Sequence, residues 1–224
     1  MSPIALVGGN EFRRECEAMD RALLQMIGGA GARLLILPTA ATNENPHVAG
    51  ASGARHFRRL GARAESLLIV DAESAANPVI AAEIDRAQAV YLTSGDPIYL
   101  LDTLRGSLAG EAILALHGRG GLVIGSSAGA MVLGGQMWRL DGWTEALGLA
   151  PQMAVLPHHA TLSVRWGAER LAQTLPAGVT LVGIDETTAL LLPEGRVIGA
   201  GAVTLYGAAG ARAYEAPAVV PPLA

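Results

Sequence analysis

The stretch "LVIGSSAGAMVLGG" at residues 122–135 places two serines between an apolar run and a run of small residues. The apolar run predicts a buried strand, and the small residues predict a tightly packed helix. A strand that turns directly into a helix projects the residue at the bend outward, and the two backbones approach so closely that bulky neighbours do not fit. Gly125, Ala128 and Gly129 meet that requirement, which makes Ser127 a candidate nucleophile.

Two other interpretations of this stretch stay open on the sequence alone. Ser126 or Ser127 could cap the following helix, as serine does before many helices, and elbows of small residues also bind phosphates and dinucleotides. A serine hydroxyl is unreactive at neutral pH until a base removes its proton, so a nucleophilic Ser127 requires a histidine at a neighbouring strand end. The first N–H groups of the helix would then stabilise negative charge on a carbonyl oxygen.

The order of predicted elements indicates a single α/β domain over residues 1–224. Before residue 134, apolar runs alternate with helical patterns, which predicts a parallel sheet with helices on both faces. Later strands are short with few helices between them, which predicts an antiparallel extension of that sheet. The core spans about 3–205, and the proline-broken tail 214–224 is expected to be an extended surface segment. The predicted strands are 3–9, 33–40, 65–71, 89–96, 120–129, 135–143, 152–158, 180–184, 188–195 and 196–207, and the predicted helices are 11–27, 47–62, 78–86, 97–116 and 163–175.

The composition excludes several classes of function. The 224 residues are 51% hydrophobic but only 4% aromatic, so the core is built from small aliphatic side chains and glycine. The net charge is −4 and the sixteen basic residues are scattered, so we expect neither nucleic acid nor a membrane as a partner. All sixteen are arginine, which excludes Schiff-base chemistry and a lysine general base.

The single cysteine, Cys16, excludes an intramolecular disulfide and a zinc site made of thiolates. It lies among apolar residues at helical spacing, which is typical of a small buried side chain. We expect no metal and no cofactor. The N-terminal residues lack the features of a signal peptide, and no run reaches about eighteen uncharged apolar residues, so we expect a cytoplasmic protein, with a homodimer left open.

Two of the five histidines occupy the place that a base for Ser127 needs. An apolar strand ends in a proline followed by His158 and His159, so we expect one of this pair to be the base. Adjacent residues of an extended chain point to opposite sides, which disfavours one metal ion being bound by both. We interpret the other three histidines as structural, at the surface, at a boundary or in a turn: His47, His56 and His117.

Several motifs in a fixed order together resemble peptidase family S51, which includes dipeptidase E (an aspartyl dipeptidase) and cyanophycinase. A set of ordered motifs is more specific than any single one. The resemblance spans roughly residues 3–205 and implies a class I glutamine amidotransferase-like fold and serine peptidase activity. The motifs are "LPTA" (37–40), "YLTSGDPIYLLDTLR" (91–105), "VIGSSAGAMVL" (123–133), "GLAPQMAVLPHH" (148–159), "SVRWGAERL" (163–171) and "GIDETTALLL" (183–192).

The resemblance implies roles for four residues around the elbow. The family's nucleophile corresponds to Ser127, and its histidine corresponds to His158. Its glycine-rich segment corresponds to "TSGD" at residues 93–96, so the implied oxyanion-hole N–H groups are those of Gly95 and Ala128. The sequence departs from the family at three positions: Thr93 and Ser94, in place of glycines, and His159, in place of an aromatic residue.

The family pattern also places an acidic residue between the serine and the histidine, where it orients the histidine. This chain offers Asp141 and Glu145 in that interval. We prefer Asp141 as the third member of the triad, because it follows a strand-like segment at about the family's offset from the serine. Glu145 is the alternative.

The resemblance further implies an acidic substrate. Family dipeptidases cleave after an N-terminal aspartate, and the arginine that holds this aspartate corresponds to Arg165. A guanidinium pairs bidentately with a carboxylate, which explains such a preference. Asp185 and Glu186 form a further acidic pair, and Glu186 is a candidate for binding the substrate amine. We therefore expect a serine exopeptidase, an Asp-X dipeptidase, that acts on small peptides.

Three rival functions are weighed against this expectation. A cyanophycinase-like hydrolase of β-linked Asp-Arg is less favoured, because segment 157–166 lacks the glutamine before histidine and the closely spaced arginines of such enzymes. A non-catalytic, amidotransferase-like binding module would tolerate the loss of His158, and amidotransferases of this fold use cysteine at the elbow. A Rossmann nucleotide site is disfavoured because "GGAGAR" (28–33) precedes a strand instead of following one.

Overall fold

The first sheet of the computed structural model has seven strands in the order β11-β10-β1-β5-β4-β2-β3. The structure describes residues 2–139, 141–207 and 210–222. The five strands from β1 to β3 in this order are parallel, while β10 pairs antiparallel with β1 and β11 with β10. The strands are β1 (Ile4–Val7), β2 (Arg33–Leu37), β3 (Arg63–Ser66), β4 (Ala89–Leu92), β5 (Leu122–Ser126), β10 (Thr188–Leu192) and β11 (Arg196–Gly199).

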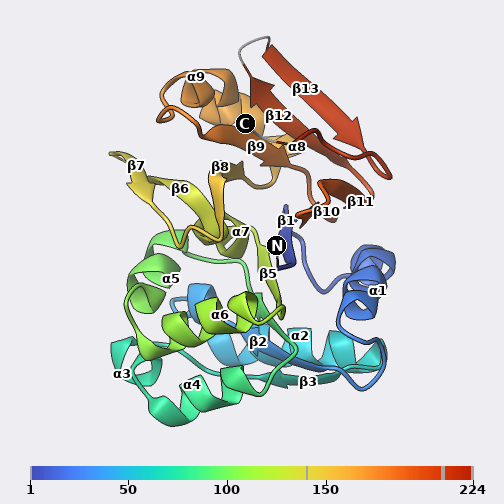
Figure 1. Cartoon of the computed structure of the whole chain (residues 1–224), viewed down its shortest axis with the longest axis vertical. Coiled ribbons are helices and arrows are strands. Elements are labelled where there is room, and N and C mark those ends of the chain that lie inside the picture. The colour runs from blue at the N-terminus through green and yellow to red at the C-terminus, as the bar shows by residue number, and fades with distance from the viewer. Residues whose placement is uncertain (1, 140, 208–209, 223–224) are drawn as a thin grey trace.

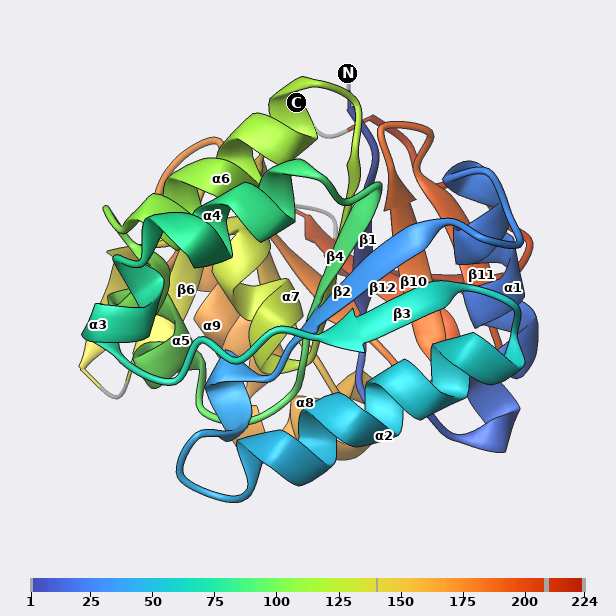
Figure 2. The same cartoon turned by 90° about the horizontal axis from the view of Figure 1, so that it is seen from below.

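Helices cover both faces of this sheet, as the continuous apolar strands predict (Figure 2). Alternate residues of β1 show the arrangement: Ala5 and Val7 pack toward α1 and α2, whereas Ile4 and Leu6 face the core that contains α4 to α7. The helices near this sheet are α1 (Glu17–Met26), α2 (Pro46–Arg59), α3 (Ala72–Ala75), α4 (Pro78–Asp85), α5 (Pro97–Leu104), α6 (Leu108–Gly118) and α7 (Ala128–Leu133), with short 3-10 turns η1 (Arg14–Cys16) and η2 (Thr39–Ala41).

The sequence analysis expected the later strands to extend the first sheet, but only β10 and β11 do so. Six of them form a second sheet in the order β13-β12-β9-β8-β6-β7 (Figure 1). Helix α7 explains this separation, because all six of its residues are buried and its side chains share one core with both sheets. A helix that is apolar all round needs cover on both sides. The strands are β6 (Gly134–Arg139), β7 (Gly142–Glu145), β8 (Ala150–Leu156), β9 (Thr180–Ile184), β12 (Ala202–Gly207) and β13 (Gly210–Glu215).

Two predicted long helices are each divided by a glycine. In place of one helix at 97–116, the structure has two helices, α5 and α6. Gly106 lies between them with a φ of +68°. The helix expected at 163–175 is divided into α8 (His159–Trp166) and α9 (Ala168–Gln173) by Gly167, at φ +60°. Glycine adopts this left-handed conformation without steric cost. Across the described residues, no helix combines the length and the apolar character needed to cross a membrane.

The C-terminal tail packs against the first sheet instead of lying free on the surface. The Val197 N–H donates to the Ala218 carbonyl at 2.8 Å, and the Val220 N–H donates to the Gly195 carbonyl at 2.8 Å. The Val220 side chain is buried in the core. The tail therefore contributes to the fold up to Val220 at least, while residues 223–224 lie outside the described residues.

His56 does not lie at the surface or a boundary, where the sequence analysis placed it. It is buried, and its Nε2 lies 2.7 Å from Oδ2 of the buried Asp20. Burial raises the pKa of Asp20, while the hydrogen bond from His56 acts in the opposite direction. The pair joins α1 to α2 on one face of the first sheet, so we interpret His56 as a structural residue.

Candidate active site

Ser127 lies at a strained bend between β5 and α7. Its φ of +50° and ψ of −107° fall outside the regions that non-glycine residues favour. Its N–H donates to the Val7 carbonyl at 2.9 Å, which holds the bend against β1. A Cβ at Gly125 would lie 2.4 Å from the backbone of Gly129, so the small residues of the motif are required by the close approach of strand and helix. Within the described residues, the Ser127 side chain makes no capping hydrogen bond to α7, which removes the capping interpretation.

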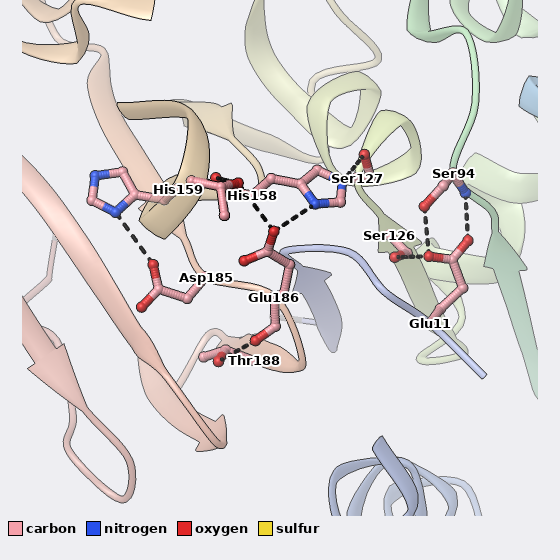
Figure 3. Close-up of polar contacts among 10 residues, drawn as sticks. Glu11, Ser94, Ser126, Ser127, His158, His159, Asp185, Glu186 and Thr188 are labelled. Atoms are coloured by element: carbon pink, nitrogen blue, oxygen red, sulfur yellow. Dashed lines mark hydrogen bonds and ion pairs between the residues drawn. The ribbon is translucent and has the colours of Figure 1, made fainter. Parts of the chain in front are cut away.

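His158 reaches Ser127 from the end of β8, in the other sheet. Its Nε2 lies 3.0 Å from Ser127 Oγ (Figure 3). The backbone N–H of His158 donates to the Gly8 carbonyl at 2.8 Å, so the loop after β1 fixes the position of the histidine. A Cβ on Gly9 would lie 2.3 Å from Cε1 of the imidazole, so only glycine leaves room for the ring.

The carboxylate beside His158 belongs to Glu186, not to Asp141. Glu186 Oε1 lies 3.2 Å from His158 Nδ1 and accepts a hydrogen bond from Thr161 Oγ1 at 3.1 Å. Partial burial raises the pKa of Glu186, but hydrogen bonds from its own backbone N–H, from His158 and from Thr161 outweigh burial and lower it overall. An ionised Glu186 accepts a hydrogen bond from Nδ1–H, which leaves Nε2 free to accept the Ser127 hydroxyl proton.

The two acids expected to orient the histidine are elsewhere. Asp141 is exposed in the turn between β6 and β7, and Glu145 is exposed at the end of β7. That hairpin forms the edge of the second sheet, whereas Glu186 follows β9, the parallel neighbour of the strand that carries His158. The expectation that Glu186 binds the substrate amine stays a prediction, and the contacts with His158 and Thr161 both use its Oε1.

His159 points away from Ser127 and belongs to a separate cluster. Its Nδ1 lies 3.3 Å from Asp185 Oδ1, and its Nε2 lies 2.8 Å from the Tyr206 hydroxyl. A Cβ on Gly183 would lie 2.1 Å from the His159 ring, so the ring is held against β9. Burial, followed by the charge of Glu169, raises the pKa of Tyr206, so that hydroxyl stays protonated. The structure therefore brings His158 to Ser127, and not His159.

A cavity of about 500 Å³ opens in front of Ser127 and His158. Gly95 and Ala128 lie in its wall beside Ser127. Gly95 has a φ of +141°, and a Cβ there would lie 2.1 Å from the Ala40 carbonyl oxygen, so this position requires glycine. The rest of the wall is largely apolar with two arginines, from the residues Pro97, Ile98, Met131, Trp138, Arg139, Leu156, Pro157, Leu162, Arg165, Trp166 and Leu171.

The two arginines differ in their surroundings. Arg165, on α8, is exposed at the cavity. Arg139, which the sequence analysis did not single out, lies 3.4 Å from Asp102 in an ion pair. The Arg165 guanidinium is therefore better placed to meet an acidic ligand at the cavity wall, because that of Arg139 already contacts a carboxylate. Among the described residues, no three His, Cys, Asp or Glu side chains are grouped as metal ligands would be.

Glu11 is a polar residue of the site that the sequence analysis missed. Its carboxylate accepts hydrogen bonds from Ser94 and Ser126, which precede Gly95 and Ser127 in the chain. The signal available in the sequence was an acidic residue at the start of the first predicted helix, two positions after the strand end where functional groups collect.

Comparisons with known proteins place this geometry among peptidases. The model of peptidase family S51 matches residues 4–199. The crystal structure of a peptidase from an acI-B1 actinobacterium is similar, with 28% sequence identity, a TM-score of 0.85, and coverage of 96% of this chain and 95% of that chain. A candidate peptidase E protein from Listeria monocytogenes EGD-e shares the fold, at 20% identity and a TM-score of 0.67 over 89% of this chain and 98% of that chain. No curated protein matches the sequence.

Proposed function

We propose that this chain, which belongs to peptidase family S51 and is therefore a peptidase, is a serine exopeptidase that hydrolyses Asp-X dipeptides. The observation that supports a serine mechanism is the line of hydrogen bonds from Glu186 through His158 to Ser127, at the wall of a cavity. The same three roles, namely nucleophile, base and orienting acid, define serine hydrolases on unrelated folds.

In the proposed reaction, Ser127 Oγ attacks the carbonyl carbon of the peptide bond while its proton passes to His158 Nε2. The C–N bond then breaks, the leaving amine takes the proton from His158, and the aspartyl group remains on Ser127 as an ester. A water molecule, deprotonated by His158, attacks this ester and restores the serine. Glu186 stabilises the imidazolium that exists in both steps.

The N–H groups proposed to hold the developing oxyanion are those of Gly95 and Ala128. Both residues lie in the cavity wall with Ser127, and Ala128 is the first residue of α7. The N–H groups of a first helical turn are not used within the helix and carry its positive dipole end. Donors of this kind typically contribute about a hundredfold or more to the rate of acyl transfer.

The acidic preference is proposed to depend on Arg165, with Arg139 nearby. Arg165 is exposed at the cavity, in the helix that begins directly after His158. The carboxylate side chain of the aspartate whose carbonyl is attacked can pair with a guanidinium, and an amide of the same shape pairs far less well.

A panel of Asp-X, Asn-X, Glu-X and β-Asp-X dipeptides tests the proposal. We expect release of aspartate from Asp-X, with a loss of about a thousandfold or more in Ser127→Ala. The preference for Asp-X over Asn-X should fall about tenfold in Arg165→Gln and stay unchanged in Arg170→Gln, a matched exposed arginine of α9. Preferential cleavage of β-Asp-Arg would indicate a cyanophycinase-like hydrolase. No hydrolysis, combined with no labelling of Ser127 by a fluorophosphonate, would indicate a binding module.

A further inference from the structure

We propose that Glu11 is a positioning residue that holds the oxyanion-donor turn at Gly95 against the strand that carries the nucleophile. The inference rests on the proposed serine mechanism, because it assigns the Gly95 N–H to the oxyanion. Glu11 touches neither Ser127 nor the cavity wall in the described contacts, so it acts through its neighbours and not on the substrate.

The contacts of Glu11 join the two halves of the proposed oxyanion site. Its Oε1 accepts the Ser94 backbone N–H at 2.8 Å, and its Oε2 accepts the Ser94 hydroxyl at 2.5 Å. Oε2 also accepts the hydroxyl of Ser126, which is completely buried, at 2.9 Å. One carboxylate therefore fixes the residue before Gly95 and the residue before Ser127. Figure 3 shows this cluster on the side of Ser127 away from His158.

The backbone around Glu11 is itself held in an unusual conformation. Asn10 and Phe12, on either side of Glu11, have φ values of +60° and +64°. A bulky residue such as Phe12 rarely adopts this conformation, and such strain persists only where the surroundings impose it. The Phe12 ring packs against Phe57 and Tyr91, which anchors the loop to the core. The loop thus presents the Glu11 carboxylate from a fixed position.

Gly95 needs such a restraint because glycine has the widest conformational freedom of any residue. The N–H of Asp96, on its far side, donates to the Ala40 carbonyl at 2.8 Å. On its near side, both the N–H and the hydroxyl of Ser94 are held by Glu11. Without Glu11 the turn would keep the far anchor and the weaker hydrogen bond from Thr93 Oγ1 to the Ser94 carbonyl at 3.3 Å. The Ser94 N–H and hydroxyl would lose their acceptor, and the Gly95 N–H would sample directions away from the oxyanion. Catalytic donors misplaced by about 1 Å typically lower rates by about a hundredfold.

The test compares Glu11→Ala, Glu11→Gln and the matched control Glu15→Ala, an exposed carboxylate of the adjacent turn η1. We expect kcat of Glu11→Ala to fall about 10–100-fold with KM within about threefold, since the oxyanion forms only in the transition state. Glu11→Gln should recover most of kcat, because its amide oxygen accepts the Ser94 N–H and its NH2 group donates to the two hydroxyls. Glu15→Ala should match the wild type.

A kcat of Glu11→Ala equal to that of Glu15→Ala, or an equal loss in Glu11→Gln and Glu11→Ala, would overturn the inference. If Glu11→Ala does not fold, Glu11→Gln and Ser94→Ala decide it, since each keeps part of the contact. For Ser94→Ala, a fall of about 2–10-fold in kcat at constant KM supports the inference and no fall overturns it, whereas Glu11→Gln is still expected to keep most of kcat.

Labelling of Ser127 by a fluorophosphonate, followed by mass spectrometry, separates this inference from the peptide specificity. Such a probe needs the activated serine and the oxyanion donors but no dipeptide. If the wild type is labelled and Glu11→Ala is labelled about tenfold more slowly, the role of Glu11 holds even where no Asp-X peptide is cleaved. If the wild type is neither labelled nor active, the serine mechanism fails and the role of Glu11 fails with it.

Discussion

Two consecutive histidines and two consecutive acids form two pairs, and the main difference between the pairs is the group at the other end of the imidazole. His158 bonds with Glu186 and its Nε2 faces the hydroxyl of Ser127. His159 bonds with Asp185 and its Nε2 faces the hydroxyl of Tyr206. The first pair opens onto the cavity, whereas the second lies between α8 and the second sheet.

This difference shows that a histidine–acid pair is not by itself a catalytic unit. The Ser127 hydroxyl is presented by a strained bend at the first turn of a helix, with small neighbours and N–H groups around it. The Tyr206 hydroxyl lies on a regular strand, β12, and its raised pKa keeps it neutral. The same imidazole chemistry is proposed to activate one hydroxyl and only to hold the other in place.

The two pairs should differ most in the effect of removing their histidines. We expect His158→Ala to lower kcat about a thousandfold or more, because nothing else can take the Ser127 proton. His159→Ala should change kcat less than about threefold but reduce the free energy of unfolding by about 1–3 kcal/mol, through the loss of two hydrogen bonds. Steady-state kinetics and urea unfolding measure the two effects. Equal kinetic losses in both variants would contradict the division of roles.

Replacing the two acids should produce the same difference between the pairs, with smaller effects on kcat. Glu186→Gln keeps the shape but not the charge, and we expect kcat to fall about 10²–10⁴-fold. Asp185→Asn should leave kcat within about threefold and cost about 1 kcal/mol of stability, because Asp185 Oδ2 also accepts the Ala202 N–H at 2.9 Å. A larger kinetic effect for Asp185→Asn than for Glu186→Gln would place the orienting acid in the other pair.

The pH dependence of the free energy of unfolding should show whether Glu186 is ionised in the folded protein. The folded-state pKa of Glu186 lies below its ordinary value of 4.5, so the unfolded chain takes up this proton first as the pH falls. The stabilisation by ionised Glu186 is therefore complete above pH 4.5 and is lost as the pH falls through the lower folded value. The stability difference between wild type and Glu186→Gln, followed by denaturation across that range, should shrink at low pH. A constant difference would contradict the lowered pKa.

The smallest effect is expected at the acid that the sequence favoured. Asp141 is exposed in a turn, away from both pairs, so Asp141→Asn should leave kcat within about twofold and stability within about 0.5 kcal/mol. The same dipeptide assay measures it beside Glu186→Gln. A kinetic loss at Asp141 comparable to that at Glu186 would restore the original assignment.

The parts of this protein that local sequence predicts well are those that local physics determines. The small residues around Ser127 predict the tight strand-to-helix bend, and the continuous apolar strands predict helices on both faces of a parallel sheet, which the structure confirms. The strand end that carries His158 is equally local. Glycines at 106 and 167 divide two predicted helices, an outcome that helical periodicity alone does not resolve.

The contacts that the sequence did not predict join distant segments. Glu186 lies 28 residues after His158 and reaches it only because β8 and β9 are parallel neighbours. The family pattern places the orienting acid between the serine and the histidine, an interval that does not include Glu186. Glu11 is separated from Ser126 by 115 residues. Separation into two sheets also depends on the burial of α7 from both sides, which its six residues alone do not reveal.

The backbone at Ser127 has a consequence for any attempt to make this protein more robust. A serine at φ +50° and ψ −107° carries about 1–3 kcal/mol of unfavourable energy that a glycine would largely relieve. A screen that selects only for heat resistance would therefore favour variants that replace Ser127, the proposed nucleophile. Engineering of this chain therefore needs simultaneous selection for catalytic activity, because stability and activity favour different residues at position 127.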